Sequence, residues 1–161
     1  MMYRLLDACC GQKVWWKGRD TTNVVFLDIL ESVQPSVRGT MIALPFRDSV
    51  FDEIWCDPPH LIRNDVKHWN PSYLRYGRWR TRTEWTTAIA AIGPEFARVA
   101  RQDALLVMKI IDGSTDTHKR TIQLDDLSPL ETYWDCTNVE YAKTKVPWSS
   151  AFTVFVYYCR K

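Results

Sequence analysis

Short apolar runs, each closed by turn residues, constrain the fold of this chain more than any other feature of its sequence. Several runs are apolar at nearly every position, which is typical of strands covered on both faces of a parallel sheet. Between the fourth and fifth runs, Glu84–Ala100 carries apolar residues at spacings of three and four, which predicts a helix that Gly93-Pro94 should kink or split. The predicted strands are Tyr3–Ala8, Val24–Ile29, Thr40–Leu44, Phe51–Cys56, Ala104–Ile111, Val139–Lys143 and Ala151–Tyr158.

The order of these elements predicts an α/β domain with a mostly parallel, doubly wound sheet. A second, weaker helix is expected at Thr117–Leu127, and the last two strands, joined around Pro147, should form an antiparallel hairpin at one sheet edge. The helices are reduced, because too few residues separate Gly11 from Val24 for a complete crossover helix with its turns. A chain of 161 residues is expected to form a single domain.

Composition narrows the setting of the protein but not its function. The net charge is only +2, so any surface that binds nucleic acid must be local. The five cysteines form no C-x-x-C pair, which argues against a disulfide framework and against a zinc site. No apolar run is long enough to span a bilayer, and the apolar part of the first residues is too short for a signal peptide. A reduced, cytoplasmic setting is therefore expected.

The first two predicted strands end in acidic residues that suggest a binding site. Leu5–Gly11 runs from a strand into a turn of small residues, where doubly wound sheets bind their ligands. Asp28 ends the next strand about 20 residues after Asp7, where such folds bind ribose hydroxyls. Cys9 and Lys13 stand where a phosphate-binding loop has glycines, which favours a nucleoside ligand without a phosphate group. A plain strand, turn and surface acid remain the alternative.

The fourth predicted strand ends in Asp57, two prolines and His60. The prolines fix the backbone and remove two N–H groups, so carbonyl oxygens and the Asp57 carboxylate are left as preorganised acceptors. Such acceptors suit the two N–H donors of a nucleobase amine, on which an aromatic ring can stack. An Asp-Pro turn that merely leaves a strand is the alternative. The functional interpretation requires Asp57 to lie outside any buried salt bridge and to face a cleft shared with Asp28.

In motif order, Leu5 to about Lys109 resembles the class I S-adenosylmethionine-dependent methyltransferases, and among them the amino-methyltransferases of nucleobases. The stretches "LLDACCG", "VVFLD" and "GTMIALPFRDSVFDEIWCDPPH" carry the resemblance. The chain is most similar to small stand-alone methyltransferases of phages and prokaryotes, in which Asp-Pro-Pro-His also occurs. Two departures are the histidine at position 60, where Tyr, Phe or Trp is usual, and the absence of glycine at Cys9 and Lys13.

This resemblance implies a Rossmann-like methyltransferase sheet, S-adenosylmethionine as cofactor, and direct transfer of a methyl group to an exocyclic amine. N6 of adenine is the first expectation and N4 of cytosine the second. The implied catalytic residues are Asp57, Pro58, Pro59 and His60. The implied cofactor-binding residues are Asp7, Cys9, Gly11, Asp28, Ile29, Thr40, Met41 and Ile42.

A basic and aromatic segment, residues 61–83, follows the Asp-Pro-Pro-His motif and is interpreted as a substrate-binding insertion or a lid. Basic groups contact phosphates and aromatic rings stack on unpaired bases, which suits a strand with one base turned out. A lid with its aromatic residues packed inward and its arginines solvated is the alternative. The predicted contact residues are Arg63, Lys67, Trp69, Tyr73, Arg75, Arg78, Trp79 and Arg80.

The sequence therefore predicts a methyltransferase that modifies a base amine in DNA without a metal. The same chemistry on RNA stays open, because contacts to the 2′-hydroxyl are not visible in a sequence. A catalytically weak nucleic-acid-binding protein that keeps the fold also stays open, although Asp28 and Asp57 are both present. The sequence also leaves open whether the protein forms a homodimer. Lys109, at the end of the fifth predicted strand, is expected to contact a phosphate or to be solvated.

Overall fold

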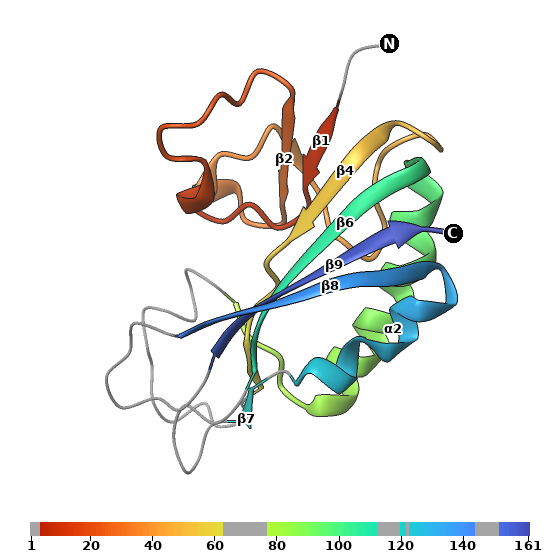
Figure 1. The fold of residues 1–161 in the computed structure, drawn as a ribbon. Helices are drawn as coiled ribbons and strands as arrows, with labels where there is room; N and C mark the ends of the chain where they lie inside the picture. Colours follow the sequence, from red (N-terminus) through yellow and green to blue (C-terminus); the bar gives the residue numbers. More distant parts are fainter. Residues whose placement is uncertain (1–3, 63–76, 113–119, 122, 144–151) are drawn as a thin grey trace.

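The computed structural model describes residues 4–62, 77–112, 120–121, 123–143 and 152–161 of the chain. Its main sheet consists of β1 (Leu5–Asp7), β2 (Val24–Asp28), β3 (Val37–Arg38), β4 (Phe51–Cys56), β6 (Ala100–Asp112), β8 (Trp134–Lys143) and β9 (Phe152–Arg160). The strands lie in the order β3-β2-β1-β4-β6-β9-β8 (Figure 1). The first five in this order are parallel, whereas β9 and β8 are antiparallel to their neighbours. The predicted α/β fold, mostly parallel with an antiparallel C-terminal strand pair, is confirmed.

The strand order reverses beside β1, and ligands bind at such a point in doubly wound sheets. β1 lies between β2 and β4, and Asp7 at its end is level with Phe26 and Trp55. All three residues of β1 are buried, because a central strand is covered on both faces. The carboxyl ends of β1, β2 and β4 therefore open at the same edge of the sheet.

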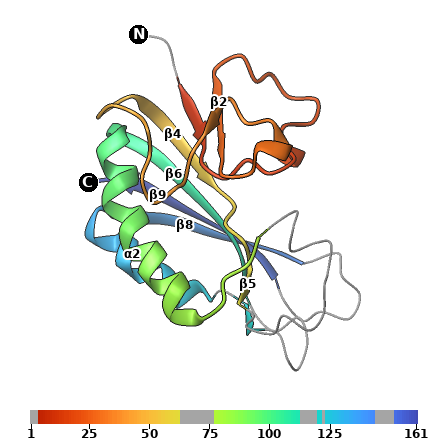
Figure 2. The same ribbon diagram turned by 180° about the vertical axis from the view of Figure 1, so that it is seen from behind.

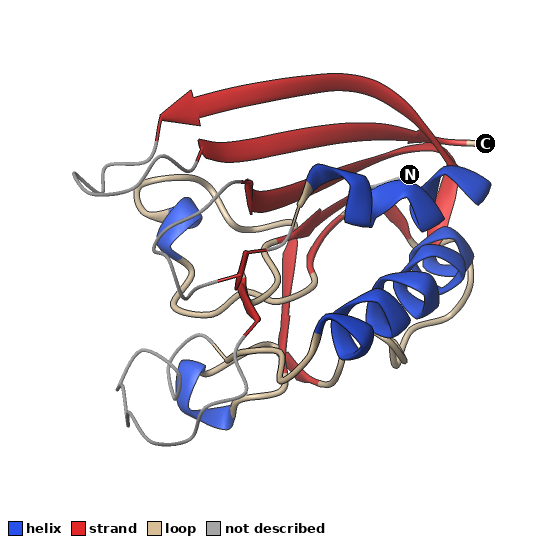
Figure 3. Cartoon of the chain, turned by 90° about the horizontal axis from the view of Figure 1, so that it is seen from below, coloured by secondary structure: helices blue, strands red, loops and turns tan. Residues whose placement is uncertain are grey.

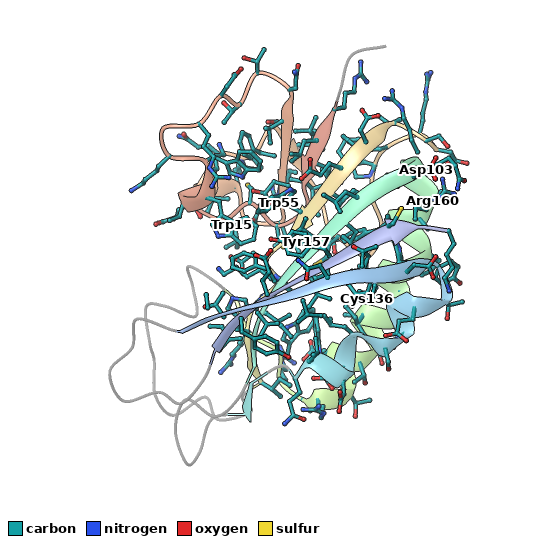
Figure 4. The ribbon with its side chains drawn as sticks, in the orientation of Figure 1. Trp15, Trp55, Asp103, Cys136, Tyr157 and Arg160 are labelled. Carbon is teal, nitrogen blue, oxygen red and sulfur yellow. The ribbon has the colours of Figure 1, made fainter. Side chains whose placement is uncertain are left out.

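Helical segments cover one face of the sheet more fully than the other. α2 (Arg82–Val99) and the 3₁₀ helix η3 (Leu124–Thr132) pack side by side on one face, as Figure 2 and Figure 3 show. In the described residues, the other face carries only the 3₁₀ helices η1 (Val14–Trp16) and η2 (Glu31–Val33). There Trp15 and Trp16 pack against Trp55; the first and last of these are labelled in Figure 4. Aromatic side chains thus stand where a crossover helix would pack, and the predicted reduction of the helices is confirmed.

α2 begins after Thr81, whose side-chain oxygen accepts a hydrogen bond from the backbone N–H of Glu84 at 3.0 Å. Its buried face includes Trp85, Ile89, Ile92 and Phe96. Pro94 lies on the exposed side, and the buried residues before and after it keep the helix continuous. The helix predicted at Glu84–Ala100 is confirmed, and it is not split at Gly93-Pro94. The described helices include none with the length and apolar character needed to cross a bilayer.

The strand predicted at Thr40–Leu44 is wrong. Thr40 and Ala43 form only an isolated bridge, and the third strand of the sheet is Val37–Arg38. The backbone N–H of Ala43 donates to the carbonyl of Thr40 at 3.2 Å, which closes a turn between Gly39 and the following loop. The apolar side chains of this stretch line the cavity or pack at the edge of the core. Their apolar character therefore does not indicate a paired β-strand.

Of the helix predicted at Thr117–Leu127, only residues 124–127 are helical, and residues 117–119 and 122 lie outside the described residues. Arg120–Thr121 forms a short strand, β7, which pairs with β5 (Leu61–Ile62) in a separate two-stranded sheet. η3 begins only after Gln123, which forms a capping box with Asp126, and it continues through Pro129. Ser128-Pro129 therefore lies inside a helical segment instead of ending one.

The remaining strands agree with their predictions to different degrees. β4 matches the predicted Phe51–Cys56 at both ends. β6 and β8 begin earlier than predicted, at Ala100 and Trp134, because their first residues pair although they are not continuously apolar. Predicted and observed ends of β1, β2 and β9 differ by one or two residues.

Arg98, near the end of α2, binds the loop of residues 44–48 that leads into β4. Its guanidinium donates to the carbonyls of Phe46 (2.8 Å) and Leu44 (3.1 Å) and contacts the carboxylates of Asp48 and Glu95, each at 2.7 Å. A lysine cannot reproduce this planar set of donors. We expect Arg98→Lys to lower the free energy of unfolding by about 1–2 kcal/mol, as measured by urea denaturation. The exposed Arg19→Lys is the matched control, and equal stability of the two variants would contradict this role.

Candidate active site

A cavity of about 750 Å³ opens at the carboxyl ends of β1, β2 and β4, a size that suits a small-molecule ligand. All twelve residues predicted to be catalytic or cofactor-binding line it, although they come from four separate stretches of the chain. Arg78 and Trp79 of the predicted substrate-binding set also line it. Arg80 is exposed and is not among the lining residues. The other predicted contacts lie outside the described residues; these are Arg63, Lys67, Trp69, Tyr73 and Arg75.

Asp28 holds the two loops that flank one end of the cavity. Its Oδ2 accepts a hydrogen bond from the backbone N–H of Gly11, and its Oδ1 accepts one from that of Leu30, both at 2.9 Å. Each carboxylate oxygen can accept more than one hydrogen bond, so both retain capacity for a ligand hydroxyl. Ile29 and Ile42 are 63% and 45% exposed and supply apolar walls beside it. This end of the cavity suits a ribose and a flat apolar ring.

The turn after β1 replaces a glycine-rich loop with unusual backbone conformations. Gly11 has φ +46° and Lys13 has φ 55°, so two residues of the turn adopt the left-handed region. A side chain at Gly11 would meet no atom within 4 Å, because its Cβ position points into open space. Lys13 tolerates its conformation while its ammonium donates to the carbonyl of Gln34 at 2.6 Å. The glycine missing at position 13 therefore does not prevent the sharp turn.

Asp7 is a buried carboxyl group at the floor of the cavity, only 3% exposed. Its Oδ2 accepts a hydrogen bond from the indole N–H of Trp16 at 2.7 Å, whereas Oδ1 has no partner among the described residues. Burial raises the pKa of Asp7 to about 7; the carboxylates of Asp57 and Asp28 add to this, and the hydrogen bonds from Trp16 and Cys9 oppose it. A carboxyl group of this kind is poised to accept a cationic or N–H group of a ligand.

The raised pKa of Asp7 predicts a specific dependence of stability on pH. The folded state binds the proton more tightly than the unfolded state, so the free energy of unfolding falls as the pH rises from about 4 to about 7 and is level above that range. Asp7→Asn keeps an acceptor for Trp16 and removes the charge, so it should raise stability at pH 8 by about 2–4 kcal/mol. Urea denaturation at pH 5 and pH 8 tests this; an identical pH dependence in both proteins would contradict it.

Asp57 does not meet one of the two conditions set by the sequence. Its carboxylate faces the cavity that Asp28 also lines, as required. However, its Oδ2 lies 2.6 Å from the ammonium of Lys109, so the carboxylate is paired, and the expectation of an unpaired carboxylate is wrong. Oδ1 has no hydrogen-bond partner in the described residues and is shielded from solvent. Oδ1, and the remaining acceptor capacity of Oδ2, are left to bind a ligand.

His60 covers the second oxygen of Asp57. Its Nε2 lies 2.8 Å from Oδ1, yet this oxygen completes no well-aligned hydrogen bond in the described residues, and Nδ1 of His60 is buried without a partner there as well. Burial raises the pKa of Asp57, but its contacts with His60 and Lys109 outweigh burial and hold the pKa below its usual value. Asp57 is therefore an ionised acceptor. Oδ1 of Asp57 and Nδ1 of His60 are therefore polar atoms to which a ligand could hydrogen-bond.

The two prolines are held from the side by the segment that follows residue 76. The indole N–H of Trp79 donates to the carbonyl of Pro59 at 2.8 Å, and Trp79 also bridges to Ile62. Gly77 has φ +71°, and a Cβ there would come within 3.0 Å of the Pro59 ring. This glycine is needed because the two segments approach so closely. The loop after β4 is thus rigid for a second reason besides its prolines.

Cys9, expected near the methionine part of a cofactor, has a structural contact as well. Its sulfur lies 3.4 Å from that of Cys56 and accepts a hydrogen bond from the backbone N–H of Asp57 at 3.1 Å. The hydrogen bond with Cys56 and burial raise the pKa of the Cys9 thiol, so it stays protonated. Cys9 therefore joins the turn after β1 to the Asp-Pro-Pro-His loop after β4, a contact that a glycine could not make.

Sequence reasoning missed several residues of the cavity wall. Trp15 and Gln12 come from the turn after β1, and Ile111 and Thr153 come from the paired strands β6 and β9. The tryptophan is in contact with Trp55 on β4, ring centres 5.1 Å apart. The excess of tryptophans was the available signal, because so many exceed what a small core hides.

Comparison of the sequence with known protein families and with curated proteins gives no match. Solved structures nevertheless resemble the fold. Geranyl diphosphate C-methyltransferase from Streptomyces coelicolor A3(2), solved with Mg²⁺, geranyl diphosphate and S-adenosyl-L-homocysteine, has a TM-score of 0.66 at 10% identity over 99% of this chain and 74% of that one. A protein from Pyrococcus horikoshii OT3 has a TM-score of 0.61 at 12% identity over 100% and 83%. The cyclase SpnF has a TM-score of 0.64 at 12% identity over 98% and 74%.

At these identities the likeness concerns the fold alone. A cyclase stands beside a methyltransferase among the similar structures, so the fold does not by itself fix the reaction. The predicted fold is confirmed: the chain has the Rossmann-like sheet of the class I S-adenosylmethionine-dependent methyltransferases.

Proposed function

We propose that this protein transfers a methyl group from S-adenosylmethionine to the exocyclic amine of a nucleobase in nucleic acid. DNA is the expected substrate, with N6 of adenine ahead of N4 of cytosine. One observation carries the proposal: Asp57, at the head of Asp-Pro-Pro-His, turns its carboxylate to the cavity that Asp28 also lines, and its Oδ1 completes no hydrogen bond among the described residues although the ring of His60 lies 2.8 Å away. The unexpected ion pair with Lys109 engages Oδ2 and leaves this acceptor in place. An acceptor placed there suits an N–H donor.

The residues at the Asp28 end of the cavity fit S-adenosylmethionine. Asp28 can accept from both ribose hydroxyls, and Ile29 and Ile42 can flank the adenine ring. The unpartnered Oδ1 of Asp7 suits the ammonium group of the methionine part, next to the open space at Gly11. Bound there, the cofactor supplies an electrophilic methyl group on a sulfonium. The similar fold of a structure solved with S-adenosyl-L-homocysteine supports this assignment.

At the other end, the protein's task is to hold and orient an amine. Oδ1 of Asp57 accepts one N–H and the carbonyl of Pro58 accepts the other, which aims the nitrogen lone pair at the methyl group. The ring of His60 must leave Oδ1 for this to happen, and it is then free to lie against the base. Trp79 fixes the Pro59 carbonyl and so steadies the backbone on which Pro58 sits. No proton has to leave before transfer, because the lone pair is the nucleophile. Transfer converts the sulfonium to the neutral thioether S-adenosyl-L-homocysteine, and the methylated nitrogen then loses one proton, for which the Asp57 carboxylate is the adjacent acceptor.

A nucleic-acid substrate is supported by charge and aromatic groups at the cavity. Arg78 and Trp79, from the basic and aromatic segment, line it together with His60. An arginine suits a phosphate, and an aromatic ring suits an unpaired base. The rest of the segment lies outside the described residues, so its contribution stays a prediction. A catalytically weak nucleic-acid-binding protein would use the same surface without transfer.

His60 favours a second candidate, methylation of a hydroxyl group on a small molecule. His60 lines the cavity, its Nε2 faces the Asp57 carboxylate and its buried Nδ1 has no partner among the described residues, an arrangement that suits a general base. A similar structure is named as a geranyl diphosphate C-methyltransferase, so a small molecule is the acceptor there, although on carbon and not on a hydroxyl group. A base is needed for a hydroxyl acceptor but not for a nucleobase amine, so replacing His60 by Phe separates the two.

Labelled methyl transfer tests the proposal. Purified protein is incubated with methyl-labelled S-adenosylmethionine and, separately, single-stranded DNA, duplex DNA, RNA and a panel of small hydroxyl compounds. The proposal expects label in nucleic acid, most of it in DNA, and at least about one tenth of the activity in His60→Phe, which retains a ring for stacking. Transfer only to small molecules, abolished in His60→Phe, supports the second candidate. Tight binding of nucleic acid without any transfer supports the binding protein.

A further inference from the structure

Lys109 contacts two residues of the cavity wall that come from different parts of the chain, Asp57 and Trp15. It lies on β6, and its side chain is only 19% exposed. Its ammonium is 2.6 Å from Oδ2 of Asp57 and 4.8 Å from the centre of the Trp15 ring. All three residues line the cavity. The expectation that Lys109 is a solvated strand-end lysine is therefore wrong.

The two carboxylate oxygens of Asp57 are in different situations. Oδ2 is engaged in a short, charge-assisted contact with Lys109, whereas Oδ1 has no hydrogen bond. A half-turn about the Cβ–Cγ bond only exchanges two equivalent oxygens, but a partial turn would direct both away from their present positions, and the ion pair opposes such a turn. The Trp15 ring restricts the ammonium from a second element of the fold, through a cation–π contact.

We propose that Lys109 is a positioning residue for methyl transfer, which holds Oδ2 of Asp57 so that Oδ1 is presented to the acceptor amine. This inference rests on the proposed function, because it assigns Lys109 a role in that reaction. A carboxylate that is free to turn would offer its oxygen in the right direction only part of the time. Small errors in the orientation of an acceptor cost about 10²-fold in rate.

The charge of Lys109 has a second effect, on the ionisation of Asp57. Burial raises the pKa of Asp57, and the contacts with His60 and Lys109 overcome it. The other titratable or charged groups that line the cavity are Asp7 on β1, Cys9 and Cys10 after β1, Asp28 on β2 and Arg78. Without Lys109, less positive charge opposes the effect of burial and of the nearby carboxylates on the pKa of Asp57. The pKa of Asp57 must then rise, and the carboxylate becomes protonated at a higher pH.

Three variants separate charge from packing. Lys109→Met removes the charge and keeps an unbranched apolar stem beside Trp15. Lys109→Arg keeps the charge, and Lys161→Met is the matched control, because Lys161 pairs with Asp135 at 3.5 Å on the surface away from the cavity. Thermal unfolding establishes that each variant is folded. Lys109→Gln is the second neutral variant if Lys109→Met does not fold.

In Lys109→Met, we expect kcat to fall by about 10- to 100-fold while KM for S-adenosylmethionine changes by less than about threefold. The acid limb of the pH–rate profile should move to higher pH by about one unit, as expected for loss of an adjacent opposite charge. Lys109→Arg should recover most of the rate and an acid limb near that of the wild type. Lys161→Met should behave as the wild type.

A measurement without catalysis accompanies the kinetics. The carboxyl ¹³C signal of Asp57, assigned by its absence in Asp57→Asn, should titrate at a higher pH in Lys109→Met than in the wild type. A Lys109→Met enzyme with the wild-type kcat and acid limb, or with an unchanged Asp57 titration, overturns the role of Lys109 alone. A wild-type protein that methylates no nucleic acid overturns the proposed function and this role together.

Discussion

Replacing Asp57 with asparagine is expected to lower the rate of methyl transfer by at least about 10³-fold, while the affinity for S-adenosyl-L-homocysteine stays within about threefold of the wild type. Lys109 binds the oxygen on one side of the Asp57 carboxylate. An asparagine would turn its oxygen to that ammonium and its NH₂ group to the Oδ1 position. The acceptor amine would then face a donor instead of an acceptor. Single-turnover kinetics and calorimetry measure the two effects separately.

Asp52→Asn is the matched control for this substitution. Asp52 lies on the same strand, β4, and is also paired, with its two oxygens 2.6 and 2.7 Å from Arg101. It lies at the other end of the strand and does not line the cavity. We expect this control to retain its rate even where it loses some stability. An Asp57→Asn enzyme with more than about one tenth of the wild-type rate would contradict the assigned role of Asp57.

Removal of Asp28 should abolish useful cofactor binding. Asp28→Ala loses the acceptor for the ribose hydroxyls and also releases the backbone N–H groups of Gly11 and Leu30, which its two oxygens hold at 2.9 Å. We expect the Kd for S-adenosyl-L-homocysteine to rise by at least about 10²-fold, the equivalent of two charge-assisted hydrogen bonds. Isothermal titration calorimetry with the folded variant measures this change.

The exposed Asp135→Ala serves as the control for Asp28→Ala, since Asp135 lies on β8 and makes only a 3.5 Å surface contact with Lys161. It should bind S-adenosyl-L-homocysteine as tightly as the wild type. If Asp28→Ala also kept its affinity within about threefold, the cavity would not bind the cofactor in the way described here.

Much of the sheet could be predicted because its central strands are covered on both faces. In Phe51–Cys56, the first and the last three residues are apolar, and Asp57 with two prolines follows directly. Both ends of this strand could therefore be predicted from the sequence. β6 and β8 extend beyond the predicted Ala104 and Val139, since pairing with a neighbour continues where apolar character stops. Whether the terminal residues of a strand are paired depends on the neighbouring strand, which cannot be identified from a single sequence.

The wrong elements have a common cause, which is that tertiary contacts override local pattern. Thr40–Leu44 is apolar like a strand, yet its apolar residues face a cavity and a core edge. Pro94 would end an isolated helix, but buried residues on both sides of it keep α2 intact. Local rules describe each stretch alone and cannot weigh it against its neighbours.

The residues predicted for the candidate site line one cavity, but the contacts among them were not predicted. Asp7, Asp28 and Asp57 end three parallel strands, and the carboxyl ends of such strands meet at one edge of a sheet. The ion pair between Asp57 and Lys109 joins residues 52 positions apart and depends on side-chain directions that motif order does not contain. A charged residue within an otherwise apolar strand was the signal that could have revealed it.

The position of the transferred methyl group tests the central claim most directly. DNA treated with the wild-type protein and methyl-labelled S-adenosylmethionine is digested to nucleosides and analysed by mass spectrometry, beside DNA treated with Asp57→Asn. The account predicts label on an exocyclic nitrogen, N6 of adenine before N4 of cytosine, with almost none from the variant. Label on a ring carbon, on an oxygen or on a phosphate, or equal label from both proteins, would contradict it.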